Sequence, residues 1–134
     1  MSTIDHFNRL GSGHLPGHLG MVITAVDSLE IRAELQVTPS LMAPNGFLHA
    51  GTVVSLADTA AGYGCVAHLP EGAKGFTTLE IKSNHLGTVR EGVVACVARA
   101  VHAGRSTQIW DADVFEKATG RRIALFRCTQ MILY

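Results

Sequence analysis

Residues 49–67, HAGTVVSLADTAAGYGCVA, form the longest segment of the chain in which glycine is the only helix-breaking residue. If this segment is a helix, small or apolar side chains lie on nearly all its sides, which predicts a buried helix rather than a surface one. Each glycine costs a helix about 1 kcal/mol relative to alanine. The glycines therefore indicate that another part of the protein packs close to the helix backbone.

Strands are predicted on both sides of this helix. Before it, two strands at 21–26 and 29–37 are joined by a tight turn, and apolar residues alternate with polar ones in the second. After it, turn residues separate four long strands, at 75–86, 92–103, 105–116 and 121–133. A hairpin, a central helix and then an antiparallel meander predict an α+β fold in which a curved sheet holds one helix.

The remaining segments add three expectations. We expect a short helix at 2–10 and a loop at 11–20. His14 and His18 lie in that loop, and the proline and glycine between them are expected to prevent a helical metal-binding pair. The strand at 92–103 is apolar on both faces, whereas antiparallel sheets usually expose one face to water. We therefore expect another subunit to cover its second face.

The composition describes a single globular domain, residues 1–134, with balanced charge. Eleven Lys and Arg residues match eleven Asp and Glu residues, and the sequence pI is about 7.1. This balance argues against a nucleic-acid-binding protein that relies on overall positive charge. Among the basic residues only Arg9 and Arg32 precede residue 74, so the C-terminal half is the part suited to an anionic ligand.

Three cysteines, Cys65, Cys96 and Cys128, lie far apart in apolar segments. An odd number with wide spacing and no CxxC pair is typical of buried free thiols in a reducing compartment, and not of disulfides or zinc. The N-terminus MSTIDHFNRL lacks the pattern of a signal peptide, and no run of 18 apolar residues is present. We therefore expect a cytoplasmic protein that does not insert into a membrane.

Asp58 is the residue that does not fit the apolar segment. It is the only Asp, Glu, Lys or Arg between Glu34 and Glu71, and it lies in the middle of the predicted helix. One interpretation is structural, with Asp58 bonded to the hydroxyl of Ser55 or Thr59 or paired with a distant arginine. The other is a desolvated carboxylate that acts as nucleophile or general base. Because burying a carboxylate without a partner is unfavourable, we favour the functional interpretation.

The start of the predicted helix offers a second chemical group. The sequence PNGFLHAG, residues 44–51, places His49 and Gly51 at that start, where backbone N–H groups lack intrahelical acceptors and the helix dipole is positive. Such an end can polarise a carbonyl that becomes an oxyanion. His49 and Asp58 are about 13 Å apart along one helix. They can therefore act on one bond only if the preceding chain folds back, or if the helix start of another subunit faces Asp58.

Residues 44–64, PNGFLHAGTVVSLADTAAGYG, resemble the signature of hotdog-fold acyl-CoA thioesterases. The most similar branch contains the phenylacetate-degradation and 4-hydroxybenzoyl-CoA thioesterases. That branch shows Gly-x-Leu-His-Gly-Gly, with Leu-Ala-Asp or Leu-Ala-Glu ending nine residues after the histidine. The corresponding residues here are Gly46, Leu48, His49, Ala50, Gly51, Leu56, Ala57 and Asp58. Ala50 replaces the first glycine of the family's Gly-Gly pair, and alanine still donates a backbone N–H. Segments 77–92 and 102–124 resemble the family's later strands and its coenzyme A-binding segment.

The resemblance implies a hotdog fold and a homodimer with two sites at its interface, usually assembled further into a homotetramer. It implies that Asp58 attacks the thioester carbonyl or activates water, and that the backbone N–H of Ala50 polarises that carbonyl. His49, with Gly51, would orient this loop or contact the thioester. The implied substrate is an acyl-CoA, or an acyl carrier protein thioester. Coenzyme A enters only as part of the substrate, and no metal or other cofactor is implied.

Two positions depart from the family pattern in ways that affect the site. Ala43 stands where the family often carries Asn or Gln. Asn45 is the only nearby amide, and it either substitutes for that residue or belongs to a turn, which we favour. Gly62 stands where the glutamate-bearing relatives have Ser or Thr, so a hydroxyl that positions water would come from elsewhere, with Thr77 and Thr78 as candidates.

Further substrate-binding candidates come from the later segments. His85 falls near the family's substrate-contacting region, although a plain surface or core histidine explains it equally well. Arg105, between Gly104 and Ser106, is suited to bind a coenzyme A phosphate through its planar guanidinium. Arg90 is a further candidate in a predicted turn, where a solvated side chain without a binding role is the interpretation that the sequence favours.

Two other functions fit the same fold. A hotdog hydratase or dehydratase usually carries a different Asp and His arrangement, and no second pair of that kind is apparent. A non-catalytic acyl-CoA binding or sensing module would keep the phosphate contacts but would not need Asp58. The sequence pattern does not distinguish aromatic from aliphatic acyl groups.

Overall fold

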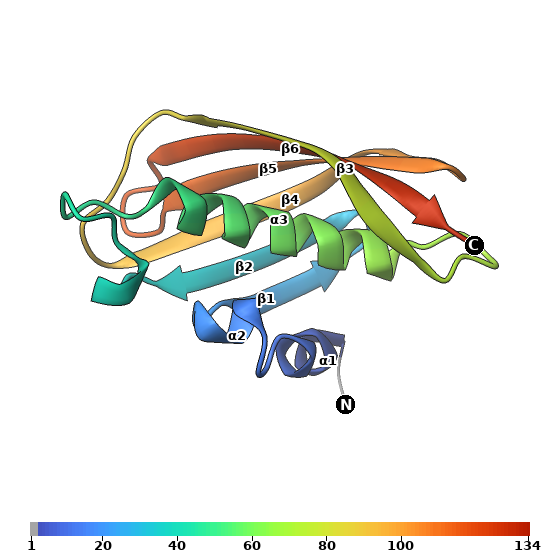
Figure 1. Ribbon diagram of the computed structural model, residues 1–134, viewed down its shortest axis with the longest axis horizontal. Helices are drawn as coiled ribbons and strands as arrows, with labels where there is room; N and C mark the ends of the chain where they lie inside the picture. Colours follow the sequence, from blue (N-terminus) through green and yellow to red (C-terminus); the bar gives the residue numbers. More distant parts are fainter. Residues whose placement is uncertain (1–2) are drawn as a thin grey trace.

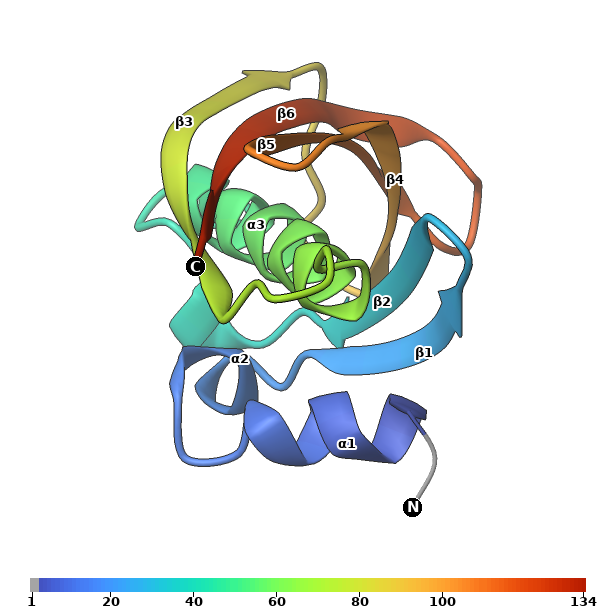
Figure 2. The same cartoon turned by 90° about the vertical axis from the view of Figure 1, so that its right-hand side faces the viewer.

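The computed structural model describes residues 3–134 of the chain. Its helices are α1 (Thr3–Leu10), α2 (Leu15–His18) and α3 (Ala50–Ala67), with a short 3-10 helix, η1 (Pro39–Leu41), before α3. Its strands are β1 (Val22–Asp27), β2 (Glu30–Gln36), β3 (Gly75–His85), β4 (Val93–Ala103), β5 (Thr107–Glu116) and β6 (Arg122–Leu133). The strands form one antiparallel sheet that curves around α3 (Figures 1 and 2). The predicted α+β architecture is confirmed.

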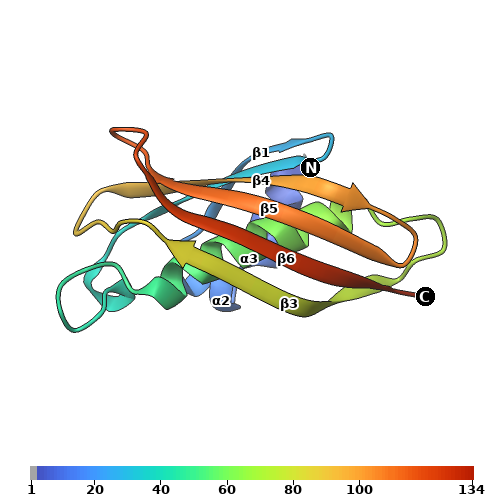
Figure 3. The same cartoon turned by 90° about the horizontal axis from the view of Figure 1, so that it is seen from above.

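The order of the strands differs from the predicted meander. It is β1-β2-β4-β5-β6-β3, so β4, β5 and β6 follow one another as predicted, but β3 lies at the far edge beside β6 (Figure 3). After β3 the chain returns past the start of α3, where the backbone N–H of Leu48 donates to the carbonyl of Val89 over 2.9 Å. The prediction is wrong here because alternation identifies a strand and its faces but not its neighbour in the sheet.

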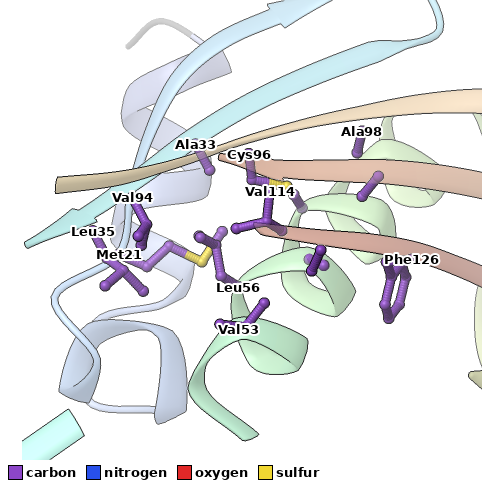
Figure 4. Close-up of a cluster of buried hydrophobic side chains, with 14 of the residues drawn as sticks. Met21, Ala33, Leu35, Val53, Leu56, Val94, Cys96, Ala98, Val114 and Phe126 are labelled. Atoms are coloured by element: carbon purple, nitrogen blue, oxygen red, sulfur yellow. The ribbon is translucent and has the colours of Figure 1, made fainter. Parts of the chain in front are cut away.

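Helix α3 is buried against the concave face of the sheet. Leu56, Ala57, Ala60 and Ala61 are fully buried, and Figure 4 shows Val53 and Leu56 beside core side chains of the sheet. The glycines allow close approach, as predicted: a Cβ added at Gly64 would lie 2.5 Å from the Trp110 ring. The helix is therefore held in one position by large side chains on its neighbours.

The N-terminal segment packs outside the sheet edge. The predicted helix at 2–10 is confirmed over Thr3–Leu10, and residue 2 lies outside the described residues. The side chain of Asn8 bonds both the N–H and the carbonyl of Ile23, at 2.8 and 3.2 Å, and so occupies hydrogen-bonding groups of the edge strand β1. Phe7 is buried and stacks on Tyr63 of α3, with ring centroids 4.8 Å apart.

The prediction of a loop at 11–20 is wrong in part, because α2 forms within it. Pro16 lies in the first turn of α2, where a helix does not need the N–H that proline lacks. His14 is the N-cap and His18 the last residue of this turn, so proline and glycine do not prevent a helical arrangement. No group of three or more potential metal-ligating side chains occurs among residues 3–134.

The second face of β4 is partly covered within one chain. Ala95 and Val97 are buried, and they line a shallow hollow shared with Phe115, Glu34 and Lys117. Lys117 and Glu34 form an ion pair of 2.9 Å there. The burial of Ala95 and Val97 therefore does not need another subunit, whereas Val93 on the same face is only half-buried. Coverage of this face by another subunit stays a prediction.

Two other expectations can be compared with the structure. The three cysteines are free and buried, as predicted. Within residues 3–134 no helix has both the length and the apolar character that a membrane span requires.

Candidate active site

Asp58 lies midway along α3 and is half-buried. Its Oδ1 atom is buried and has no hydrogen-bond partner among the described residues. The hydroxyl of Ser55 donates instead to the carbonyl of Gly51, over 2.8 Å. Burial raises the pKa of the Asp58 carboxyl, because water that would stabilise its charged form is excluded. The structural interpretation of Asp58, which requires a bonded partner, is therefore not supported.

Asp58 borders a pocket of about 360 Å³. The pocket lies between α3, the start of β3 and the N-terminal segment, and its other lining residues are Leu10, Pro16, Thr59, Gly62, Tyr63, Val66, Phe76 and Thr78. None of these residues is charged at neutral pH. The pocket therefore combines one carboxylate with apolar and aromatic walls, as expected of a site for a hydrophobic group beside a reacting centre.

Phe76 and Thr78 face this pocket from β3, whereas Thr77 between them is exposed. Gly62 explains why Phe76 can approach α3: a Cβ at Gly62 would lie 3.1 Å from the Phe76 ring. The aromatic ring thus occupies the space next to residue 62, where the sequence pattern lacks a hydroxyl. Of the two threonines proposed from the sequence, Thr78 is the one that shares the pocket with Asp58.

The start of α3 is organised by His49, which is the N-cap residue. Its ring Nδ1 accepts a hydrogen bond of 2.7 Å from the N–H of Gly51, which leaves Nε2 as the ring nitrogen that carries the proton. The N–H of Thr52 donates to the carbonyl of His49 over 2.9 Å. Within residues 3–134 the N–H of Ala50 has no acceptor, and Ala50 is exposed. A free N–H donor therefore stands at the positive end of an 18-residue helix.

Asn45 belongs to the turn before this helix, in agreement with the interpretation that the sequence favours. Its Oδ1 accepts a hydrogen bond of 3.1 Å from the N–H of Phe47, and Gly46 has a φ of 85°. Arg90 lies beside the same turn, with its guanidinium carbon 4.1 Å from the centre of the Phe47 ring. The structure therefore brings His49, Ala50 and Arg90 to one end of the molecule.

The other substrate-binding candidates do not line the Asp58 pocket. His85 is exposed at the end of β3, with its Nε2 3.2 Å from the hydroxyl of Ser83. Gly104, Arg105 and Ser106 form the turn between β4 and β5, next to the C-terminus, where the Tyr134 hydroxyl donates to the carbonyl of Arg105 over 2.6 Å. Figure 1 shows this turn at the end of the molecule opposite the start of α3. Within one chain, Arg105 and His49 are therefore not brought together.

Several pocket residues were missed from the sequence. Tyr63 and Val66 follow Asp58 on α3 and look like ordinary core residues, and Leu10 and Pro16 come from a segment distant in sequence. Only tertiary structure brings these residues to Asp58. One further residue, Gln130, carried a usable signal, because it is a lone polar side chain in the apolar alternation of β6.

The family model described as "Thioesterase superfamily" matches residues 45–123. The 1,4-dihydroxy-2-naphthoyl-CoA hydrolase of Listeria monocytogenes is 34% identical over 111 residues, which covers 83% of this chain and 89% of the relative. The enzyme with the same name from Escherichia coli is 32% identical over 134 residues, covering 98% of this chain and 95% of the relative.

Solved structures give the same result. The crystal structure of a thioesterase from Haemophilus influenzae has a TM-score of 0.92 at 32% identity, covering 99% of this chain and 92% of the other. That of a mutant thioesterase from Pseudomonas aeruginosa also has a TM-score of 0.92, at 28% identity, with coverage of 97% and 93%. Fold, sequence and family model agree: the chain belongs to the thioesterase superfamily, with the hotdog fold, and is a thioester hydrolase.

Proposed function

We propose that the protein hydrolyses an acyl-CoA thioester to the free acid and coenzyme A, at a site to which two copies of the chain contribute. The observation that carries this proposal is the carboxylate of Asp58, which borders an apolar pocket and has an Oδ1 atom without a partner among the described residues. A carboxylate held in this way is a stronger base than one in water. The names of the two curated relatives described above, which specify a CoA thioester, support this substrate class.

The reaction can be written from the residues of the site. Asp58 takes a proton from water while the water oxygen bonds to the thioester carbon. The carbonyl oxygen becomes an oxyanion and accepts a hydrogen bond from the backbone N–H of Ala50, where the helix dipole adds a favourable potential. When the carbonyl reforms, the C–S bond breaks and coenzyme A leaves as a thiolate. The proton held by Asp58 passes to the thiolate or to solvent, which restores the carboxylate.

A second copy supplies the missing half of each site. Asp58 and Ala50 lie on one helix, about 12 Å apart at 1.5 Å per residue, too far to act on one carbonyl. Strand β3 is an 11-residue edge strand with one unpaired side, and Leu79 and Ile81 on it are large exposed apolar residues. Such an edge is suited to pair with its own copy. A two-fold pairing of this kind would bring the helix start of one copy towards Asp58 of the other.

The acyl group belongs in the apolar pocket. Tyr63 and Phe76 provide aromatic surfaces there, and Val66 and Leu10 provide aliphatic ones. A pocket of about 360 Å³ has room for one or two fused aromatic rings. The two curated relatives described above are named for a naphthoyl thioester. We propose that the preferred substrates carry an aromatic acyl group. We also propose that Arg90 binds a coenzyme A phosphate, because it is exposed beside the helix start.

Assembly and location follow from the same residues. A homodimer is the smallest assembly with a complete site, and a homotetramer would hold two such dimers. The buried free thiols of Cys65, Cys96 and Cys128 support a reducing compartment, and we propose the cytoplasm.

Release of free thiol from a panel of aromatic and aliphatic acyl-CoA compounds tests the activity. We expect turnover by the wild type and a loss of about 10²- to 10⁴-fold in kcat for Asp58→Asn. Near-normal kcat in the Asp58→Asn variant would reject the role of Asp58. Binding of acyl-CoA without thiol release by the wild type would reject the enzyme and favour the binding module.

Ala50→Pro tests the oxyanion donor. Proline removes the N–H but suits the first position of a helix, and His49 already has the extended backbone, φ −64° and ψ 134°, that a residue before proline requires. We expect a folded protein with kcat reduced about 10²- to 10³-fold. Ala50→Gly, which keeps the N–H, is the matched control and should remain active.

A further inference from the structure

Gln130 is a buried polar residue that the proposed reaction does not use. Among the described residues, the buried polar side chains are Thr52, Gln108 and Gln130. Thr52 donates to a backbone carbonyl, and Gln108 connects the Trp110 indole to the carbonyl of His68. These two contacts join elements of the fold. Gln130 instead contacts a residue of the Asp58 pocket, Thr78.

Gln130 and Thr78 are cross-strand neighbours on β6 and β3. The Thr78 hydroxyl donates to Oε1 of Gln130 over 2.7 Å, and Nε2 of Gln130 contacts Sγ of Cys128 at 3.4 Å. A hydroxyl has one hydrogen and two lone pairs. Since its hydrogen is directed to Gln130, the Thr78 hydroxyl has only lone pairs left for any other partner, and Thr78 and Asp58 line the same pocket.

We infer that Gln130 is a positioning residue for thioester hydrolysis: it holds the Thr78 hydroxyl as a hydrogen-bond acceptor and prevents it from donating to Asp58. This inference rests on the proposed function. A water molecule in the pocket can then donate one hydrogen to Asp58 and the other to Thr78. Its free lone pair is left for the thioester carbon. Asp58 removes the first proton as the C–O bond forms, and the second hydrogen stays on the new acid.

The same arrangement keeps Asp58 basic. A donor to a carboxylate stabilises its charged form and lowers its pKa, and Oδ1 of Asp58 has no donor among the described residues even though Thr78 borders the same pocket. If Gln130 could not accept, the Thr78 hydroxyl would be free to turn towards Asp58. The carboxylate would then gain a donor, and the water would lose an acceptor.

Within the same chain, the other titratable groups beside Asp58 lose their protons only at alkaline pH. From α3, the hydroxyls of Thr59 and Tyr63 border the pocket, and burial raises the pKa of Tyr63. From β6, burial raises the pKa of Cys128 to about 12, with the charge of Asp58 adding to the effect. The N-terminal segment contributes Leu10 and Pro16, which do not titrate. Because the proposed function also brings His49 of a second copy towards Asp58, the pKa of Asp58 is measured on its own carboxyl as well as from the acidic limb of a pH–rate profile.

The test compares Gln130→Met, which is similar in size but has no amide, with Thr78→Val and Thr78→Ser. For Gln130→Met we expect kcat to fall about tenfold to a hundredfold, as for a misplaced reacting group, and the acidic limb of kcat/KM to move to lower pH. Thr78→Val should lower kcat without moving the limb to lower pH, and Thr78→Ser should recover part of the loss. In the double variant Thr78→Val/Gln130→Met the limb should not move down, because the hydroxyl responsible is absent.

Two measurements separate this inference from the proposed function. Carbon-13 NMR titration of the Asp58 carboxyl measures its pKa without turnover, and we expect a lower pKa in Gln130→Met than in the wild type. A folded Gln130→Met whose pKa and pH profile match the wild type would overturn the inference, while the function would stand if Asp58→Asn were inactive. If Gln130→Met did not fold, Thr78→Val would decide, since wild-type kcat in that variant would also overturn it.

Discussion

Replacing Asp58 by asparagine should make the protein more stable while it removes activity. In the folded state burial raises the pKa of Asp58, so the carboxyl binds its proton more tightly there than in the unfolded chain. Its contribution to stability is therefore fully present below the ordinary aspartate pKa and is lost as pH rises through the raised pKa. At neutral pH the ionised carboxylate destabilises the fold, and asparagine has no such charge.

The size of the effect follows from the single buried oxygen. An unsatisfied buried polar atom costs about 1 to 3 kcal/mol, and Oδ1 is the one such side-chain atom found among the described residues. Asparagine keeps a polar atom at this place but removes the charge. We therefore expect a gain near the lower end, about 1 kcal/mol, or about 4 °C in Tm for a domain of this length.

The assay is urea or thermal unfolding of both proteins from about pH 8 down to about pH 4. The stability difference in favour of Asp58→Asn should be largest at the high end and should shrink as the wild-type carboxyl takes up its proton. A variant that is less stable than the wild type at pH 8, or a stability difference that does not change with pH, would show that the ionised Asp58 carboxylate does not destabilise the fold. Ser55→Ala is a suitable control, since the Ser55 hydroxyl bonds within the helix and has no pH-dependent charge.

Three further predictions concern other parts of the chain. Gly64→Ala should lose about 1 to 3 kcal/mol of stability in urea unfolding, because its methyl group would lie 2.5 Å from the Trp110 ring, whereas Gly75→Ala, with open space around it, should change little. Burial raises the pKa of Cys65 to about 11 and those of Cys96 and Cys128 to about 12. A thiol reagent at pH 8 should therefore label the native protein slowly and the urea-unfolded protein fully. Fast labelling of the native protein would contradict the burial of these thiols. Arg90→Ala should raise KM for acyl-CoA about tenfold with little change in kcat, as for a lost charged hydrogen bond, while Arg32→Ala, which removes an ion pair with Glu30, should leave KM unchanged.

Local sequence patterns predicted most of the elements and one half of the site. The apolar segment around Asp58 predicted α3 and a carboxylate without a partner within it. The alternation in β2 predicted that Ile31, Ala33 and Leu35 are buried. These succeed because the periodicity of a helix or strand decides which side chains share a face. The position of β3 beside β6 was not predictable in this way, because strand order depends on contacts between segments distant in sequence.

The walls of the pocket show the same limit. Leu10 and Pro16 reach Asp58 only because Phe7 and Asn8 fix the N-terminal segment against α3 and β1. Proline and glycine predicted a loop where α2 forms, because they usually break helices, although the first turn of a helix tolerates proline. Under the proposed function a second copy completes each site, and the sequence of one chain does not show how two copies pack together.

Mixing two inactive variants tests whether each site combines Asp58 of one copy with the helix start of another. Asp58→Asn and Ala50→Pro each destroy both sites of a homodimer. In a mixed dimer, one site would carry both substitutions and the other neither, so equal mixing and subunit exchange should restore about a quarter of wild-type activity. If the mixture stays as inactive as its components after exchange has been verified, Asp58 and the Ala50 N–H act from the same chain. That result would contradict a site shared between two copies.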